Sequence, residues 1–110
     1  MTFDEALAAV TPALGTPRKM WRTEEWDGGY SAAIWYRGES AHTEGHISLT
    51  DEDGLVCMGA LPPHGALDRI GAWILDTTIA ADDPRAEGSV IADPVTAAKA
   101  ALAFLAEEAS

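Results

Sequence analysis

The chain has 110 residues, of which 47% are hydrophobic and 23% charged, and its formal net charge is -11. This length predicts one domain over residues 1–110 that buries a core of its own, and the apolar content argues against a disordered chain. The negative charge argues against direct binding to nucleic acid or to anionic membranes, because both need contacts from Lys and Arg.

Cysteine content and the first residues indicate the compartment. Cys57 is the single cysteine, which excludes an intrachain disulfide framework. The first residues lack the basic segment and apolar run of a secretory signal, and no apolar run is long enough to span a bilayer. We therefore expect a cytoplasmic protein with no membrane partner. The absence of Asn and Gln and the abundance of Ala indicate a GC-rich coding genome, cellular or viral.

A helix is predicted at the start of the chain, over about residues 3–14. Thr2 and Glu5 match the capping box, in which each residue satisfies the backbone N–H of the other. Apolar residues then recur at helical spacing. Pro12 must kink or end this helix, because it has no N–H and clashes with the preceding turn. Gly15 is the expected residue after its last turn.

Residues 19–26 and 30–37 predict a first hairpin, with a glycine-rich turn between them that can supply the positive φ of a tight loop. A two-residue turn would pair Trp21 with Ile34, whereas a three-residue loop would pair it with Trp35. A slip of one residue exchanges the two faces of a strand. Which aromatic rings face the core therefore stays open.

Residues 46–50 and 55–60 predict a second hairpin around an acidic turn at residues 51–54. A four-residue loop pairs Leu49 with Val56 and Ile47 with Met58. We expect these four side chains to be buried together on one sheet face. The opposite face would carry His46, Ser48 and Cys57.

The last third of the chain predicts two helices. Residues 66–80 have helical spacing of apolar side chains, although their Ile, Trp and Thr content favours a strand, and helix is the preferred interpretation. A polar loop follows at residues 81–92. Asp93-Pro94 is typical of a helix start. The face of this last helix that meets the sheet is expected to carry Val95, Ala98, Ala101, Leu102 and Leu105.

These elements predict an α+β fold, with an N-terminal helix, a four-stranded antiparallel meander and two C-terminal helices packed on the sheet. Neither an internal repeat nor a second domain is apparent.

Motifs for catalysis or metal binding are weak. The spacing of the candidate metal ligands matches no standard zinc pattern; these ligands are His42, His46, Cys57 and His64. In the expected hairpin, Cys57 and His46 are diagonal neighbours about 7–8 Å apart, too far for a nucleophile and its base. The acidic turn lacks two oxygen ligands of a calcium loop. We therefore expect no catalytic residue, no metal and no cofactor, and no enzyme activity.

The aromatic residues of the first hairpin are the best candidates for a functional surface. Side chains alternate along a strand, and one layer of helices covers only one face of a sheet, so at least one ring should be exposed beside Glu24 or Glu25. Trp and Tyr are enriched at binding hot spots. The candidate partner-binding residues are Trp21, Glu24, Glu25, Trp26, Tyr30, Trp35 and Tyr36.

This surface and the net charge predict a small protein that binds another protein, a basic one, as an inhibitor or immunity-type antagonist does. A first alternative is a structural or assembly component, such as a small phage virion protein, that forms a homo-oligomer. A second alternative is a small-ligand binder or an enzyme, for which a deep pocket near Cys57 and His46 would be needed.

Overall fold

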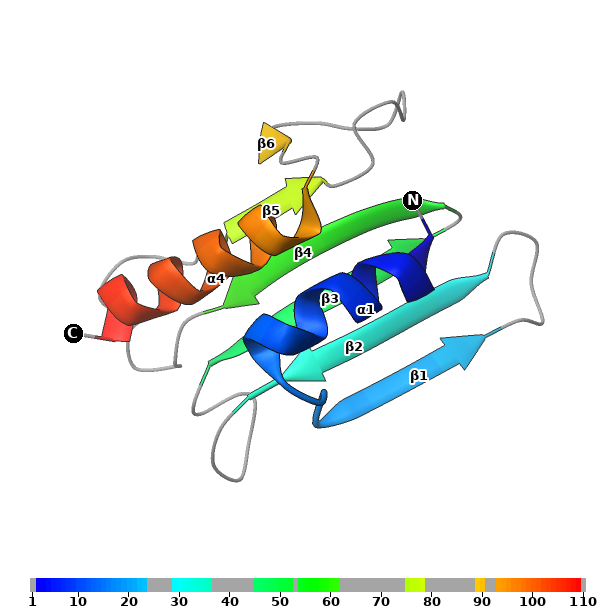
Figure 1. The fold of residues 1–110 in the computed structure, drawn as a ribbon, viewed down its shortest axis with the longest axis horizontal. Coiled ribbons are helices and arrows are strands. Elements are labelled where there is room, and N and C mark those ends of the chain that lie inside the picture. The colour runs from blue at the N-terminus through cyan, green and yellow to red at the C-terminus, as the bar shows by residue number, and fades with distance from the viewer. Residues whose placement is uncertain are drawn as a thin grey trace.

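The structure is a computed structural model that describes residues 2–23, 29–36, 45–52, 54–61, 75–78, 89–90 and 93–109. These residues form one β-sheet with two helices on the same side of it (Figure 1). In chain order the elements are α1 (Phe3–Leu14), β1 (Lys19–Thr23), β2 (Tyr30–Trp35), β3 (His46–Glu52), β4 (Leu55–Leu61), β5 (Leu75–Thr78), β6 (Ser89–Val90) and α4 (Pro94–Ala109).

The α+β fold is confirmed, with a helix at each end of the chain and an antiparallel meander between them. The sheet order is β1-β2-β3-β4-β5-β6, so each strand lies beside its neighbour in the sequence. The pairs from β1 to β5 are antiparallel, and β6 is parallel to β5. The expected four-stranded meander is therefore present as β1–β4, and two short strands extend it.

The first helix begins and ends as the sequence predicts. The Thr2 hydroxyl accepts a hydrogen bond from the Glu5 N–H at 3.1 Å, and the Glu5 carboxylate accepts one from the Thr2 N–H at 3.2 Å. This reciprocal pair is the capping box. Pro12 lies inside the helix, which ends two residues later. Gly15 follows with a φ of +81°, which glycine adopts without the steric cost of a Cβ.

The last helix also begins as predicted. The Asp93 carboxylate accepts hydrogen bonds from the Thr96 N–H at 3.1 Å and from the Thr96 hydroxyl at 2.6 Å, and Pro94 is the first helical residue. These bonds lower the pKa of Asp93, and the bond from the Thr96 hydroxyl has the largest effect. Of the predicted buried face, Ala98 and Ala101 are buried and Val95 and Leu105 are half-buried, but Leu102 is exposed, so the prediction is wrong at that position. The buried residues of α4 are Pro94, Ala97, Ala98, Ala101 and Phe104.

The second hairpin has a tighter turn than expected. Leu49 pairs with Met58 and Ile47 with Ala60, while Glu52 and Leu55 form the last pair. The predicted pairings are therefore wrong by two residues. An offset of two leaves every side chain on its face. The four residues expected to be buried together, Ile47, Leu49, Val56 and Met58, are all buried in one cluster.

The first hairpin has neither of the two expected registers. Trp21 pairs with Ala32, and Thr23 pairs with Tyr30, so residues 24–29 connect the paired ends of the strands. The two-residue-turn alternative is wrong by two positions, which again preserves the faces, whereas the three-residue alternative would have exchanged them. Trp21 consequently shares a face with Tyr30 and Ile34.

The helix predicted over residues 66–80 is wrong where the structure describes it. Leu75–Thr78 is strand β5, paired antiparallel with β4, and residues 66–74 and 79–80 lie outside the described residues. The β-branched residues of this segment favour a strand, and pairing with β4 satisfies its backbone. The short strand β6 lies within the segment predicted as a polar loop.

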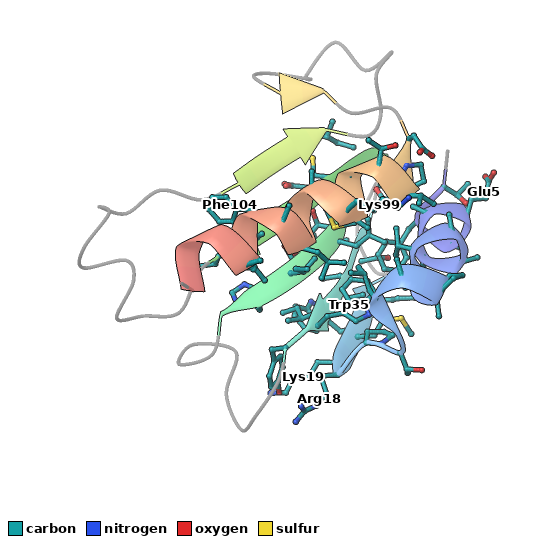
Figure 2. All side chains as sticks on the ribbon, turned by 60° about the vertical axis from the view of Figure 1, so that its left-hand side comes forward. Glu5, Arg18, Lys19, Trp35, Lys99 and Phe104 are labelled. Carbon is teal, nitrogen blue, oxygen red and sulfur yellow. The ribbon has the colours of Figure 1, made fainter. Side chains whose placement is uncertain are left out.

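The core lies between the two helices and one face of the sheet (Figures 1 and 2). The helices contribute small side chains, chiefly alanines such as Ala6 and Ala101, beside the larger Phe3, Val10 and Phe104. The sheet contributes Ala33, Trp35, Ile47, Leu49, Val56, Met58 and Ala60. The Trp35 indole N–H donates a hydrogen bond to the Gly15 carbonyl at 2.8 Å, so this ring satisfies its polar atom while it fills the core.

Met58→Ala should lower the free energy of unfolding by about 2–5 kcal/mol, because Met58 is fully buried at the centre of this core. Leu102→Ala is the matched control: its side chain is exposed on α4, and we expect a change within about 0.5 kcal/mol. Urea denaturation followed by circular dichroism measures both. Equal and small effects for the two variants would contradict the packing described here.

Candidate functional site

The side of the sheet opposite α1 and α4 is the candidate functional site. We call it the open sheet face and define it by the side chains that alternate with the core positions. On β1 and β2 these are Lys19, Trp21, Tyr30, Ala32 and Ile34, and on β3 and β4 they are His46, Ser48, Thr50, Glu52, Leu55, Cys57 and Leu61. Neither of the two described helices packs on this face (Figure 1).

Two aromatic side chains of this face are accessible to solvent. Trp21 is 41% exposed and Tyr30 is 36% exposed. Because Trp21 pairs with Ala32 across β1 and β2, Trp21 and Tyr30 are diagonal neighbours, a spacing of about 7–8 Å between Cα atoms. The expectation that at least one ring of this hairpin is exposed is therefore confirmed at two positions, whereas its placement beside Glu24 or Glu25 falls outside the described residues.

The other candidate residues are placed differently. Trp35 is on the opposite face and is buried under the helices. Tyr36 is half-buried just after β2, and its ring lies 4.6 Å from the guanidinium carbon of Arg18. Glu24, Glu25 and Trp26 lie outside the described residues. Of the seven candidates, the structure thus brings Trp21 and Tyr30 together on the open sheet face.

The described charges around these rings are of both signs. Lys19 is exposed on β1, two residues from Trp21 and on the same face. Glu52 is exposed on β3, where it pairs directly with Tyr30. Apolar and hydroxyl side chains that are half-buried occupy most of the remaining positions, among them Ile34 and Thr50. The described part of this face thus combines apolar side chains with charges of both signs.

Two arginines attach β1 to the rest of the fold. The Arg22 guanidinium forms a two-pronged ion pair with the Asp4 carboxylate of α1 and lies 5.4 Å from the centre of the Phe3 ring. The hydrogen bond from Arg22 holds the pKa of Asp4 below its usual value. Arg18 donates a hydrogen bond to the Tyr36 carbonyl at 3.2 Å while it stacks on that ring. Sequence spacing carries no signal for either contact, since the partners are 18 residues apart.

The catalytic and metal-binding candidates are not assembled into a site. Cys57 pairs with Thr50, so His46 lies four positions further along β3, roughly 13 Å at 3.3 Å per residue. The predicted diagonal contact between Cys57 and His46 is therefore wrong, because the register of β3 and β4 is offset by two residues from the expected one. His42 and His64 lie outside the described residues. Among the described residues, no group of three or more His, Cys, Asp or Glu side chains could hold a metal ion.

In the part of the chain that is described, neither helix has the length and apolar character needed to cross a bilayer. Comparison with known proteins found no family model, no curated protein and no solved structure that matches this chain. The functional assignment consequently depends on the geometry of the open sheet face.

Acrylamide quenching should separate the tryptophans by face. Trp21→Phe removes an exposed indole, so we expect the quenchable fraction of the fluorescence to fall. Trp35→Phe is the control: it removes a buried indole, and the quenchable fraction should stay equal or rise. The opposite pattern would show that the faces of β1 and β2 are exchanged.

The ion pair between Arg22 and Asp4 should make stability depend on pH. A carboxyl whose pKa is lowered by folding binds fewer protons in the folded state, so its contribution is present above the usual Asp pKa and lost as pH falls through the lowered value. Asp4→Asn should therefore flatten the loss of stability between about pH 5 and pH 3. In an Arg22→Gln background the same substitution should change this slope much less; an equal change would contradict the pairing.

Proposed function

We propose that this chain is a small protein-binding protein, an inhibitor or immunity-type antagonist, that holds a basic partner protein through the open sheet face. The observation that carries the proposal is the exposure of Trp21 and Tyr30 as diagonal neighbours on the face that neither described helix covers. An adjacent Trp and Tyr supply a large apolar area with polar atoms at the tips, which is typical of the centre of an interface.

The sheet beneath these rings favours tight binding. Ala32 lies directly opposite Trp21 and is buried. Ile34 and Thr50, its neighbours on β2 and β3, are half-buried. A paired strand holds its backbone through hydrogen bonds to its neighbours, so the anchors lose little backbone freedom on binding. Exposed aromatic side chains on paired strands of this kind suit a protein partner.

The net charge supports a basic partner. At -11, the chain produces a field that accelerates the approach of a positively charged protein. Screening limits that field to about 8–10 Å at physiological ionic strength. The association rate with such a partner should consequently fall steeply as salt is raised, whereas solubility alone gives no such dependence.

Trp21→Ala should weaken the partner complex by about 2 kcal/mol or more, roughly 30-fold in Kd, with the fold retained because the ring is largely outside the core. The partner is first captured from the native cell with the tagged wild-type chain and identified by mass spectrometry. Kd is then measured by calorimetry for wild type, Trp21→Ala, Tyr30→Ala and the control Leu102→Ala, an exposed residue on α4.

Full affinity in both aromatic variants would contradict the proposed surface, and an on-rate that salt does not change would contradict the basic partner. Light scattering on the purified chain tests the assembly alternative. A homo-oligomer that Trp21→Ala dissociates would assign the open sheet face to a second copy of the chain.

A further inference from the structure

Strand β1 forms one edge of the six-stranded sheet. Its two faces both carry an exposed apolar side chain: Met20 is 50% exposed on the side of the helices, and Trp21 is 41% exposed on the open sheet face. The helices lie further inside, with α1 over β2 and β3 and α4 over β4 and β5 (Figure 1). A strand placed beside β1 would therefore find an apolar neighbour on each of its faces.

The same strand, together with Arg18 just before it, is a basic segment in an acidic chain. Arg18, Lys19 and Arg22 are three of the seven basic residues of the whole sequence. The charge of Arg22 is paired with the Asp4 carboxylate. Among the described residues, Arg18 contacts a backbone carbonyl and an aromatic ring rather than a carboxylate. Figure 2 shows Arg18 and Lys19 together at the start of β1, away from Glu5 and from α4.

We propose that the β1 edge binds an extended acidic segment of a partner protein, which adds to the sheet as a further strand. The backbone of the segment would pair with β1, its apolar side chains would contact Met20 on one face and Trp21 on the other, and its carboxylates would meet Lys19 and Arg18. This goes beyond the proposed function, because the bound element is the strand edge and the recognised charge is negative.

A second copy of the chain fits this edge poorly. Antiparallel pairing of two β1 strands centred on Trp21 would place the two Lys19 residues four positions apart, and neither β1 strand would offer a carboxylate to the other copy's Lys19. An edge lysine is a common guard against the pairing of two copies, whereas opposite charges across a pair of strands are stabilising. Charge complementarity therefore favours an acidic segment over a second copy.

The test uses two end-blocked seven-residue peptides, one alternating glutamate and valine, the other alternating lysine and valine. Each is titrated into the full chain, and NMR measures both Kd and the amide hydrogen exchange of residues 19–23. We expect saturable binding of the glutamate peptide, with slower exchange in β1, and no binding of the lysine peptide. Lys19→Glu should weaken this binding about five- to tenfold, since it replaces an attraction with a repulsion.

Two matched variants test whether the peptide binds at the β1 edge. Lys99→Glu makes the same change in net charge at an exposed position on α4, and it should leave the affinity nearly unchanged. Tyr30→Ala removes an anchor of the open sheet face on β2, and it should also leave peptide binding nearly unchanged. Lys19→Ala, with a smaller expected loss, replaces Lys19→Glu if that variant does not fold.

Several results would overturn the proposal. These are no saturable binding of the glutamate peptide up to millimolar concentration, equal binding of the lysine peptide, unchanged exchange in β1, or equal losses in Lys19→Glu and Lys99→Glu. A loss in Tyr30→Ala as large as in Lys19→Glu would place the peptide on the open sheet face and reject the edge. Failure of the proposed function would be seen in a different measurement, as full affinity of Trp21→Ala and Tyr30→Ala for the captured basic partner. It would not change the results of these peptide titrations.

Discussion

Burial of one sheet face under two helices determines the placement of the other features of this protein. Leu49 and Met58 pair at the centre of the sheet and are completely buried, with Ala33 beside them on β2. The alanines of α1 and α4 allow both helices to approach this row closely. Because side chains alternate along a strand, fixing this face also fixes which residues lie on the other one. The exposure of Trp21 and Tyr30 follows from that alternation.

The position of β1 beyond the helices explains why its attachment differs from that of the inner strands. Its ladder to β2 is supplemented by Arg22, which reaches Asp4 and the Phe3 ring of α1, and by Arg18, which stacks on Tyr36. Exposed ion pairs contribute little individually, so this edge depends on several weak contacts acting together. The same arrangement leaves apolar and basic side chains of β1 available to a partner.

The sequence predicted what depends on local chemistry and on alternation. The caps at Thr2 and Asp93 held because a capping side chain acts within three residues. The buried faces of β3 and β4 held because a two-residue error in register preserves them. The hairpin registers failed because they depend on the length of the turn, which the alternation of side chains does not determine. Strand β5 was missed because the helical spacing was preferred over the β propensity of Leu75–Thr78 and its pairing with β4. Leu102 was misplaced because the buried face of α4 follows Ala97, Ala101 and Phe104, spaced four and three residues apart, and Leu102 lies off this line.

Thiol labelling of two adjacent strands can show whether one face of the sheet is covered and the other open. In a Cys57→Ala background, Ser48→Cys places a thiol on the open sheet face and Ala33→Cys places one under the helices, each with little change in size. Under native conditions we predict that the thiol at position 48 reacts with a maleimide much faster, while the thiol at position 33 reacts only when the fold opens. Equal rates, or a faster reaction at position 33, would contradict this arrangement of the two faces.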